Sequence, residues 1–479
     1  MTRLGVCLIC VATGALFSLG CSDDATEDQP AGPAGSTTGT PGGTATGTGG
    51  SGASSSSTGT GAGGTPPNDC TAATAEEALE GDVTADKTLT ADKVWMMNAL
   101  VRVKSGATLT IEPCTVIKGS VDPAGVLVVE PGGKIMAEGE VDRPIVFTSV
   151  GEPGDRLPGD WGGVILEGKA PINVPGGTAS IEGLDPGTVA PYGGNDPADS
   201  SGTMKFVRIE FSGKIIGANN EINGLTFGGV GSGTVIDSVM VHQTLDDCFE
   251  FFGGTVNAKH LICAGNQDDG FDWDFGYSGK LQFLALQQDP VVADDTNGFE
   301  ADNDANSSTN APISEPTIYN ATLCGKNQDV DKQQFGGLFR RSTKGHLFNI
   351  IFSGFEAGVD VRDPATSIEL KNSIFFGNVV QNIAYAEDGS DETVNKDDDA
   401  GFDETAWIND AANKNSETDP KLTACFQVGA PNFLPATTLS TDAATPPNDG
   451  FFDTSAAYIG AFTADDDWTH GAWVDFSTN

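Results

Sequence analysis

The sequence predicts an all-β fold of stacked coils, a single-stranded right-handed parallel β-helix. Apolar and polar residues alternate at period two over 101–111, and the scheme returns about 25 residues later over 127–135. In the middle of the chain, a strand-and-turn motif recurs at spacings of 24, 22 and 28 residues. No segment has the pattern of an amphipathic helix of three turns. Such repeats are typical of solenoids, and about 22–28 residues fit one three-sided coil.

The central motif is an Asn or Asp, then Gly (Cys in the second copy), then a short strand. Its four copies begin at Asn223, Asp247, Asp269 and Asn297. Asn, Asp and Gly tolerate the left-handed backbone conformation, so we expect it at each of these pairs. The apolar residues that follow alternate and should face the core: Phe249, Phe251, Phe271, Trp273, Phe299 and Ala301. Weaker copies at 337–339, 358–360 and 382–384 predict further coils.

The N-terminal region predicts export and a lipid anchor. An apolar run over 4–17 follows Arg3, which is the layout of a bacterial signal peptide (residues 1–20). The residues before Cys21 resemble a lipobox, in which the cysteine becomes a diacylated (palmitate-type) N-terminus; an ordinary signal peptide or an uncleaved anchor is the alternative. Residues 21–69 are rich in Gly, Ser and Thr and predict a flexible linker. The β-helix domain with a C-terminal extension then occupies 70–479.

Composition excludes some classes of function. With 25 Lys and Arg against 67 Asp and Glu, the net charge is −42, which repels nucleic acid. Four His residues disfavour a zinc enzyme that depends on His ligands. The expected location is the outer membrane, reached through a lipid on Cys21, with the domain exposed at the cell surface.

Six cysteines remain after Cys7, Cys10 and Cys21 are assigned to the N-terminal signal. An even number in an exported protein indicates disulfides, and six cysteines allow fifteen connectivities. We expect Cys70 to pair with Cys114 as a staple on the first coil, because Cys70 opens the folded region and Cys114 lies in the first strand repeat. The pairing of the remaining four stays open: Cys248, Cys263, Cys324 and Cys425.

The same register predicts two acidic columns on the outer side of the coils. Thr226, Glu250, Asp272 and Glu300 form the first, and Phe252, Asp274 and Asp302 the second. Carboxylates on strands about 4.8 Å apart repel by about 3 kcal/mol at an effective dielectric constant near 20. Asp246, Asp247, Asp268 and Asp269 add four more at the preceding turns.

The acidic columns predict a calcium site, because Ca²⁺ prefers oxygen ligands and His and free Cys ligands are lacking. The candidate ligands are Glu250, Asp272, Asp274, Glu300 and Asp302. Two simpler interpretations compete: the columns are a solvated acidic face, and Asp247, Asp269 and Asn297 are turn residues chosen for backbone conformation. Arg340, Arg341 and Arg362 are either counter-ions to this face or ligands for an anionic sugar. The insertion over 174–202 has no assigned role.

Several segments resemble bacterial surface proteins with pectin-lyase-like β-helices. They are Thr108–Thr148, the Gly-Asp-Trp-Gly-Gly motif at 159–163, the repeats over 204–304, and the closing motifs at 458–462 and 471–474. The resemblance implies the β-helix fold and surface display. It implies no particular activity.

A second resemblance is local. Asn266-Gln267-Asp268-Asp269 is similar to the Asn-Gln-Asp-Asp motif of polygalacturonases, which implies catalytic carboxylates at Asp268 and Asp269. The Gly-His-Gly and Arg-x-Lys motifs of that family are missing at the following coils. The sequence therefore predicts a non-catalytic surface protein that binds calcium, with glycan as a further candidate ligand. The alternatives are a polysaccharide hydrolase or lyase using Asp247, Asp268, Asp269 and Asp272, and a purely structural surface protein.

Overall fold

A computed structural model describes residues 70–217, 220–292, 295–329, 334–363, 366–385 and 402–477, all within one compact unit. The predicted signal peptide, the lipidation site Cys21 and the linker over 21–69 lie outside the described residues.

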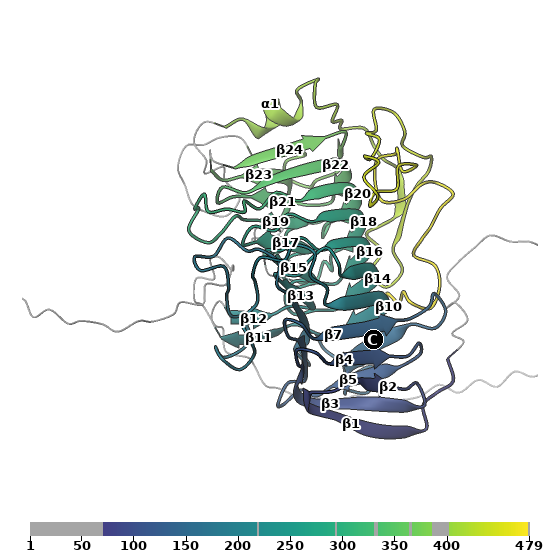
Figure 1. Cartoon of the computed structure of the whole chain (residues 1–479). Helices are drawn as coiled ribbons and strands as arrows, with labels where there is room; N and C mark the ends of the chain where they lie inside the picture. Colours follow the sequence, from purple (N-terminus) through teal and green to yellow (C-terminus); the bar gives the residue numbers. More distant parts are fainter. Residues whose placement is uncertain are drawn as a thin grey trace, which may run out of the picture. The chain divides into compact units, whose positions relative to one another are not determined.

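Parallel strands on successive coils form the body of the domain, which confirms the predicted right-handed parallel β-helix (Figure 1). One face, called face A here, carries one strand of each coil. Its strands are β6 (Val126–Val129), β9 (Gly163–Glu167), β13 (Leu225–Gly228), β15 (Phe249–Phe252), β17 (Phe271–Asp274), β19 (Phe299–Ala301), β21 (Phe335–Phe339) and β23 (Ala357–Val361).

The other two faces begin as separate short strands and then merge. The separate strands are β2 (Lys87–Leu89), β4 (Thr108–Ile111) and β7 (Lys134–Glu138) on one face, and β5 (Val116–Gly119) and β8 (Ile145–Ser149) on the other. From β10 onward, single strands run along both faces: β10 (Gly202–Glu210), β14 (Val235–His242), β16 (Asn257–Ala264), β18 (Lys280–Gln287), β20 (Thr317–Cys324) and β22 (Lys344–Ser353). The stack starts with β1 (Ala75–Val83) and β3 (Lys93–Val103) and ends with β24 (Ser367–Lys371) and β25 (Ile374–Phe375).

The long strands bend at one residue in the left-handed conformation. These residues lie at the same position on successive coils, with φ between 50° and 64°: Phe206, Ser238, His260, Phe283, Asn320, Asn349 and Asn372. Non-glycine residues rarely adopt this conformation, and Asn does so most readily. The bend therefore marks the corner between two faces of the solenoid.

The left-handed turns predicted at the Asn/Asp-Gly pairs are wrong, because neither Asn297 nor Gly298 has a positive φ, and the other three pairs do not either. Glycine is required for space instead: a Cβ on Gly298 would lie 2.5 Å from the carbonyl oxygen of Gly336 on the next coil. The side chain at the preceding position bonds between coils. Asn297 Oδ1 accepts the N–H of Phe335 at 2.9 Å.

The residues predicted to face the core are all fully buried there, and their rings stack along the solenoid. The ring centroids of Phe249 and Phe271 are 5.4 Å apart. Coil length follows the prediction of 22–28 residues in the middle of the stack but not everywhere. Phe299 pairs with Gly337, a spacing of 38, and Val164 pairs with Leu225, a spacing of 61.

The longest coil contains the predicted insertion. Residues 168–201, called the β9–β10 connection here, pack on the outer side of face A through an apolar cluster that includes Ile172, Ile181 and Tyr192. A hairpin of β11 (Lys214–Gly217) and β12 (Asn220–Ile222) lies on the same side, because Ile222 belongs to this cluster. This extra cluster gives face A a cover.

The C-terminal extension packs along the corner of the long strands (Figure 1). This part includes β26 (Leu422–Ala424) and β27 (Asn432–Pro435), whereas α1 (Glu404–Ile408) lies at the end of the stack, where Ile408 joins the solenoid core. The bend asparagines hold the extension: Asn320 Nδ2 donates to the carbonyl of Tyr458 at 2.7 Å, and Asn349 Nδ2 donates to Ala444 at 2.8 Å. The left-handed corner therefore exposes amides that bind the extension's backbone.

Three disulfides staple the domain. Cys70–Cys114 confirms the predicted pair, and Cys248–Cys263 and Cys324–Cys425 complete the set. The last one ties the extension to β20. Within the described ranges, no helix has the length and apolar character that a membrane span requires.

Candidate metal centre

The two predicted acidic columns are present on face A. Glu250 pairs with Asp272, and Asp272 pairs with Glu300, on three successive coils. In the second column, Asp274 follows Phe252, and Asp302 follows in turn because its N–H bonds to the carbonyl of Trp273 at 2.9 Å. The predicted strand register is confirmed.

The alternative interpretation of the columns as a solvated acidic face is wrong, because these carboxylates are buried. Exposed fractions lie between 0% and 8% for the five predicted ligands Glu250, Asp272, Asp274, Glu300 and Asp302. The cover is the β9–β10 connection. The Tyr192 ring packs against Phe252 at a centroid distance of 6.4 Å, and Asn173 Nδ2 donates to the carbonyl of Asn303 at 2.7 Å.

Arginines from the following coil compensate one end of the columns. Arg340 forms ion pairs with Glu300 and with Asp302, the latter at 3.0 Å from Nε to Oδ1. Arg341 Nη1 lies 2.8 Å from Asp302 Oδ2. Arg362 pairs with Asp360 at 3.0 Å. The counter-ion interpretation is confirmed for Arg340 and Arg341, whereas the partner of Arg362 lies outside the predicted columns.

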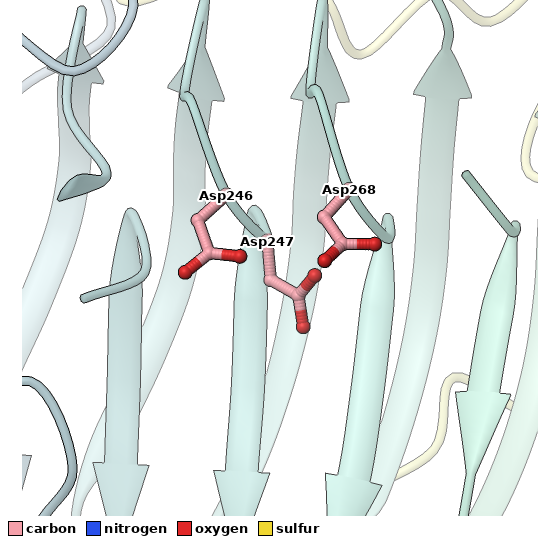
Figure 2. A group of neighbouring side chains, drawn as sticks. All are labelled: Asp246, Asp247 and Asp268. Atoms are coloured by element: carbon pink, nitrogen blue, oxygen red, sulfur yellow. The ribbon is translucent and has the colours of Figure 1, made fainter. Parts of the chain in front are cut away.

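At the other end of the columns, carboxylates approach one another closely. Ligand oxygens of Asp247, Glu250 and Asp272 all lie within 4.8 Å of one another. A second group, Asp246, Asp247 and Asp268, meets the same criterion and shares Asp247 with the first. Figure 2 shows this second group at the turns before neighbouring face A strands, with the three carboxylates side by side. We call these five residues the acidic cluster.

Hydrogen bonding leaves part of the acidic cluster unsatisfied. Asp247 Oδ1 accepts the N–H of Asp269 at 2.7 Å, which fixes its side chain. Asp246 Oδ2 and Asp272 Oδ1 are buried with no hydrogen-bond partner among the described residues. No Lys or Arg of the described chain forms an ion pair with Asp247, Glu250 or Asp272. Buried, unpaired oxygens are costly unless another group compensates them.

The electrostatic environment favours neutral carboxyls in the acidic cluster. Burial raises the pKa of Asp246 to about 7, and nearby Glu221 adds to the shift. Burial also raises the pKa of Asp247, Glu250 and Asp272 well above the usual range, and neighbouring carboxylates contribute further. A divalent cation would reverse this preference, because it stabilises the charged forms.

The predicted catalytic alternative falls in the same place. Asp247, Asp268 and Asp272 belong to the acidic cluster. Asp269 links two coils, because its Oδ1 accepts a hydrogen bond from the N–H of Asn297 on the next coil. The side chains of Asp247, Asp269 and Asn297 thus form hydrogen bonds between coils. Their backbone does not adopt the predicted left-handed conformation.

A cavity of about 510 Å³ lies elsewhere, between the solenoid corner and the C-terminal extension. Its lining includes His260, Phe283 and Trp468. No residue of the acidic cluster lines it. The acidic cluster and this cavity are therefore separate features of the domain.

Comparison with known proteins gives one finding. The family model described as a pectate-lyase like beta helix domain matches residues 81–426. The chain belongs to this family. No curated protein and no solved structure matches the chain. Membership in this family agrees with the resemblance to pectin-lyase-like β-helices and with the observed fold.

Sequence reasoning missed one acidic residue. Glu182, in the β9–β10 connection, lies close enough to Glu250 and Asp246 to interact with them electrostatically. Burial raises the pKa of Glu182 to about 8, and Asp246 adds to the shift. Glu182 lies outside the repeats, so the strand periodicity carried no signal for it.

Proposed function

We propose that this family member binds calcium in the acidic cluster and that it acts as a binding protein rather than a catalyst. The observation that carries the proposal is the convergence of five carboxylates. No arginine pairs with Asp247, Glu250 or Asp272, and one oxygen each of Asp246 and Asp272 is buried without a hydrogen-bond partner among the described residues. The two groups share Asp247, which can bridge them. Glu300 and Asp302 leave the proposed ligand set because Arg340 already pairs with both.

The chemistry of the donors supports calcium over other cations. All donors are carboxylate oxygens, which suit a hard cation with six to eight oxygen ligands at about 2.3–2.6 Å. Oxygens of one coordination shell lie within about twice that distance of each other, as the 4.8 Å limit requires. Asp268 is only half-buried, so an ion can reach the cluster from that side.

One observation favours binding over polysaccharide cleavage. The β9–β10 connection covers face A, where a polymer would have to lie. Binding of a polysaccharide elsewhere on the molecule stays a prediction.

Calcium titration of the purified domain tests the proposal. In isothermal titration calorimetry of metal-stripped protein, we expect a dissociation constant of about 0.1–1 mM, as in extracellular modules. Asp272→Asn should weaken binding by about tenfold or more, because it removes a buried ligand. The matched control is Glu152→Gln at an exposed site, which should bind as wild type does. Equal affinities for wild type and Asp272→Asn would refute the proposed site.

We also propose that the protein is anchored in the outer membrane by a lipid on Cys21 and faces the cell surface. The apolar run, the residues before Cys21 and the Gly/Ser/Thr-rich linker support this location. The three disulfides agree with folding outside the cytoplasm.

Fractionation of cells expressing the Cys21→Ser variant checks the anchor. We expect the wild-type protein in the membrane fraction and the variant in the soluble fraction, because the lipid is the proposed means of attachment. Substitution of Cys10, which lies in the predicted signal peptide, is the control and should leave the distribution unchanged. Membrane association of the Cys21→Ser variant equal to wild type would rule out the lipid anchor.

A further inference from the structure

The cavity of about 510 Å³ lies where the C-terminal extension passes the solenoid corner at β16 and β18. In the three following coils the corner residue is an Asn whose amide donates to the backbone of the extension. At β16 and β18 the corner residues are His260 and Phe283 instead. Phe283 has no side-chain donor, and His260 Nδ1 lies 2.7 Å from Asp237 Oδ1 on the preceding coil. The amide contacts that hold the extension against the corner are therefore missing here, where the cavity lies.

Three packed rings form the aromatic part of the lining. The rings of His260 and Phe283 stack at a centroid distance of 4.8 Å, and Trp468 of the extension meets the His260 ring at 5.2 Å in an edge contact. Trp468 is itself fixed, because its Nε1 donates to the carbonyl of Ala461 at 2.8 Å and its ring stacks on Phe462 at 4.8 Å. Binding of a ligand against these rings therefore costs little ordering of the protein.

The rest of the lining is polar and comes from both the solenoid and the extension. It includes carboxylates, hydroxyls and one ammonium group, from Lys259, Thr438, Asp453, Ser455, Thr463 and Asp466. Asp453 Oδ1 accepts the N–H of Ser455 at 2.9 Å and its hydroxyl at 2.7 Å, which orients the carboxylate. The Lys259 ammonium lies 4.8 Å from the ring centroid of Phe451. The cavity thus combines apolar rings with hydrogen-bond donors and acceptors in fixed positions, as small-molecule sites do.

The charges around the cavity favour an uncharged ligand. Asp453 and Asp466 would repel an anion, and the net charge of −42 adds to that repulsion. Lys259 belongs to the same lining and would repel a cation. A hydroxyl group satisfies both signs of charge, because it can donate to a carboxylate and accept from an ammonium group.

We propose that this cavity binds one neutral sugar ring, either as a free sugar or as the terminal residue of a glycan. A sugar ring carries hydroxyls around its edge and C–H groups on its faces, so it matches a lining of carboxylates, hydroxyls and aromatic rings. The volume of 510 Å³ falls within the range of about 300–1,000 Å³ that is usual for small-molecule sites. The inference goes beyond the proposed calcium function and does not depend on it, because no residue of the acidic cluster lines the cavity.

Calorimetric titration of the purified protein with glucose, galactose and mannose tests the class of ligand. We expect at least one of them to bind with a dissociation constant on the order of 1 mM. The uronate and the amino sugar with the same ring should bind at least about tenfold more weakly, because each adds a charge that the lining repels. The disaccharide of the bound sugar should bind as well as the single sugar if the natural ligand is a glycan end, and more weakly if it is a free sugar. Binding of none of the three sugars, or equal binding of a charged analogue, would overturn the inference.

A matched pair of variants locates the site. Asp466→Ala should weaken binding of the neutral sugar by about tenfold, because it removes a carboxylate acceptor. Asp465→Ala, at the adjacent exposed residue that does not line the cavity, should bind as wild type does. Both variants should melt as wild type does, since both side chains are exposed.

Imidazole NMR signals give a second readout, because the chain has four His residues. The sugar should shift the signals of His260, which the His260→Asn variant assigns, and should leave those of His346 unchanged. Asn is a suitable replacement because the following coils carry it at the same left-handed corner. Wild-type affinity in Asp466→Ala, or unshifted His260 signals at saturating sugar, would place the sugar elsewhere and overturn the inference.

Discussion

Replacing Arg340 with Met is expected to destabilise the domain by about 3–5 kcal/mol. Arg340 is 4% exposed and pairs with Glu300 and Asp302, which are 8% and 0% exposed. Its loss leaves two buried carboxylates without their main compensating charge. Burial raises the pKa of Asp302 to about 8 and the Arg340 guanidinium opposes that shift, so protonation of Asp302 in the variant should hold the cost near the lower limit.

Chemical denaturation at pH 7.5 measures this effect. The control is Arg143→Met, because Arg143 pairs with Glu140 at 3.2 Å and both side chains are largely exposed. Exposed pairs contribute about 1 kcal/mol or less, so this variant should unfold almost as wild type does. Adding Glu300→Gln to Arg340→Met should recover part of the loss. Equal unfolding midpoints for the Arg340 and Arg143 variants would show that the buried pair is not needed for stability.

Without calcium, the domain should become less stable as the pH rises from 6.5 to 8.5. The pKa values of Asp246 and Glu182 are raised by burial to about 7 and about 8, well above those of an unfolded chain. In this pH window the folded state keeps protons that the unfolded state has already lost, so stability falls as pH rises. His242, whose pKa is lowered by burial to about 4, has the opposite effect only below pH 6.5.

Calcium should remove this pH dependence, because it binds the ionised carboxylates that higher pH produces. Melting curves in EDTA at pH 6.5 and 8.5 should differ by several degrees, and millimolar calcium should raise the melting temperature mainly at pH 8.5. The same concentration of Mg²⁺ should raise the melting temperature less, since Mg²⁺ demands a stricter octahedral shell. Asp272→Asn is expected to narrow the difference in EDTA and to lose most of the calcium effect. Curves that are identical at both pH values in EDTA would contradict the electrostatic description of the acidic cluster.

Local pattern was sufficient for the solenoid and for its register. Alternation at period two fixes which side chains face the core, because successive residues of a strand point to opposite sides. The pairing of Glu250 with Asp272 and Glu300 follows from the spacing of the repeats alone. The staple between Cys70 and Cys114 could also be predicted, because both cysteines lie at the start of the stack.

The prediction of left-handed turns at the Asn-Gly and Asp-Gly pairs was wrong for a physical reason. Asn-Gly and Asp-Gly pairs are common in left-handed turns, but here glycine leaves room for the next coil and the Asp or Asn side chain bonds to it. The left-handed residues lie instead at the solenoid corner, and they include Phe206 and Phe283. Such residues adopt this conformation only because the surrounding strands impose it, so local propensity does not reveal them.

The sequence by itself determined the strands, the coil stacking and the outward columns of carboxylates. Tertiary structure decided which of those carboxylates are compensated by protein and which are not. Arg340 reaches Glu300 across a coil of 38 residues, and the β9–β10 connection buries the columns from a coil of 61. Neither of these two spacings could be predicted from the repeats, because irregular connections follow no period in the sequence. The solvated acidic face that the sequence allowed is therefore a buried site, with Arg340 at one end and unpaired carboxylate oxygens at the other.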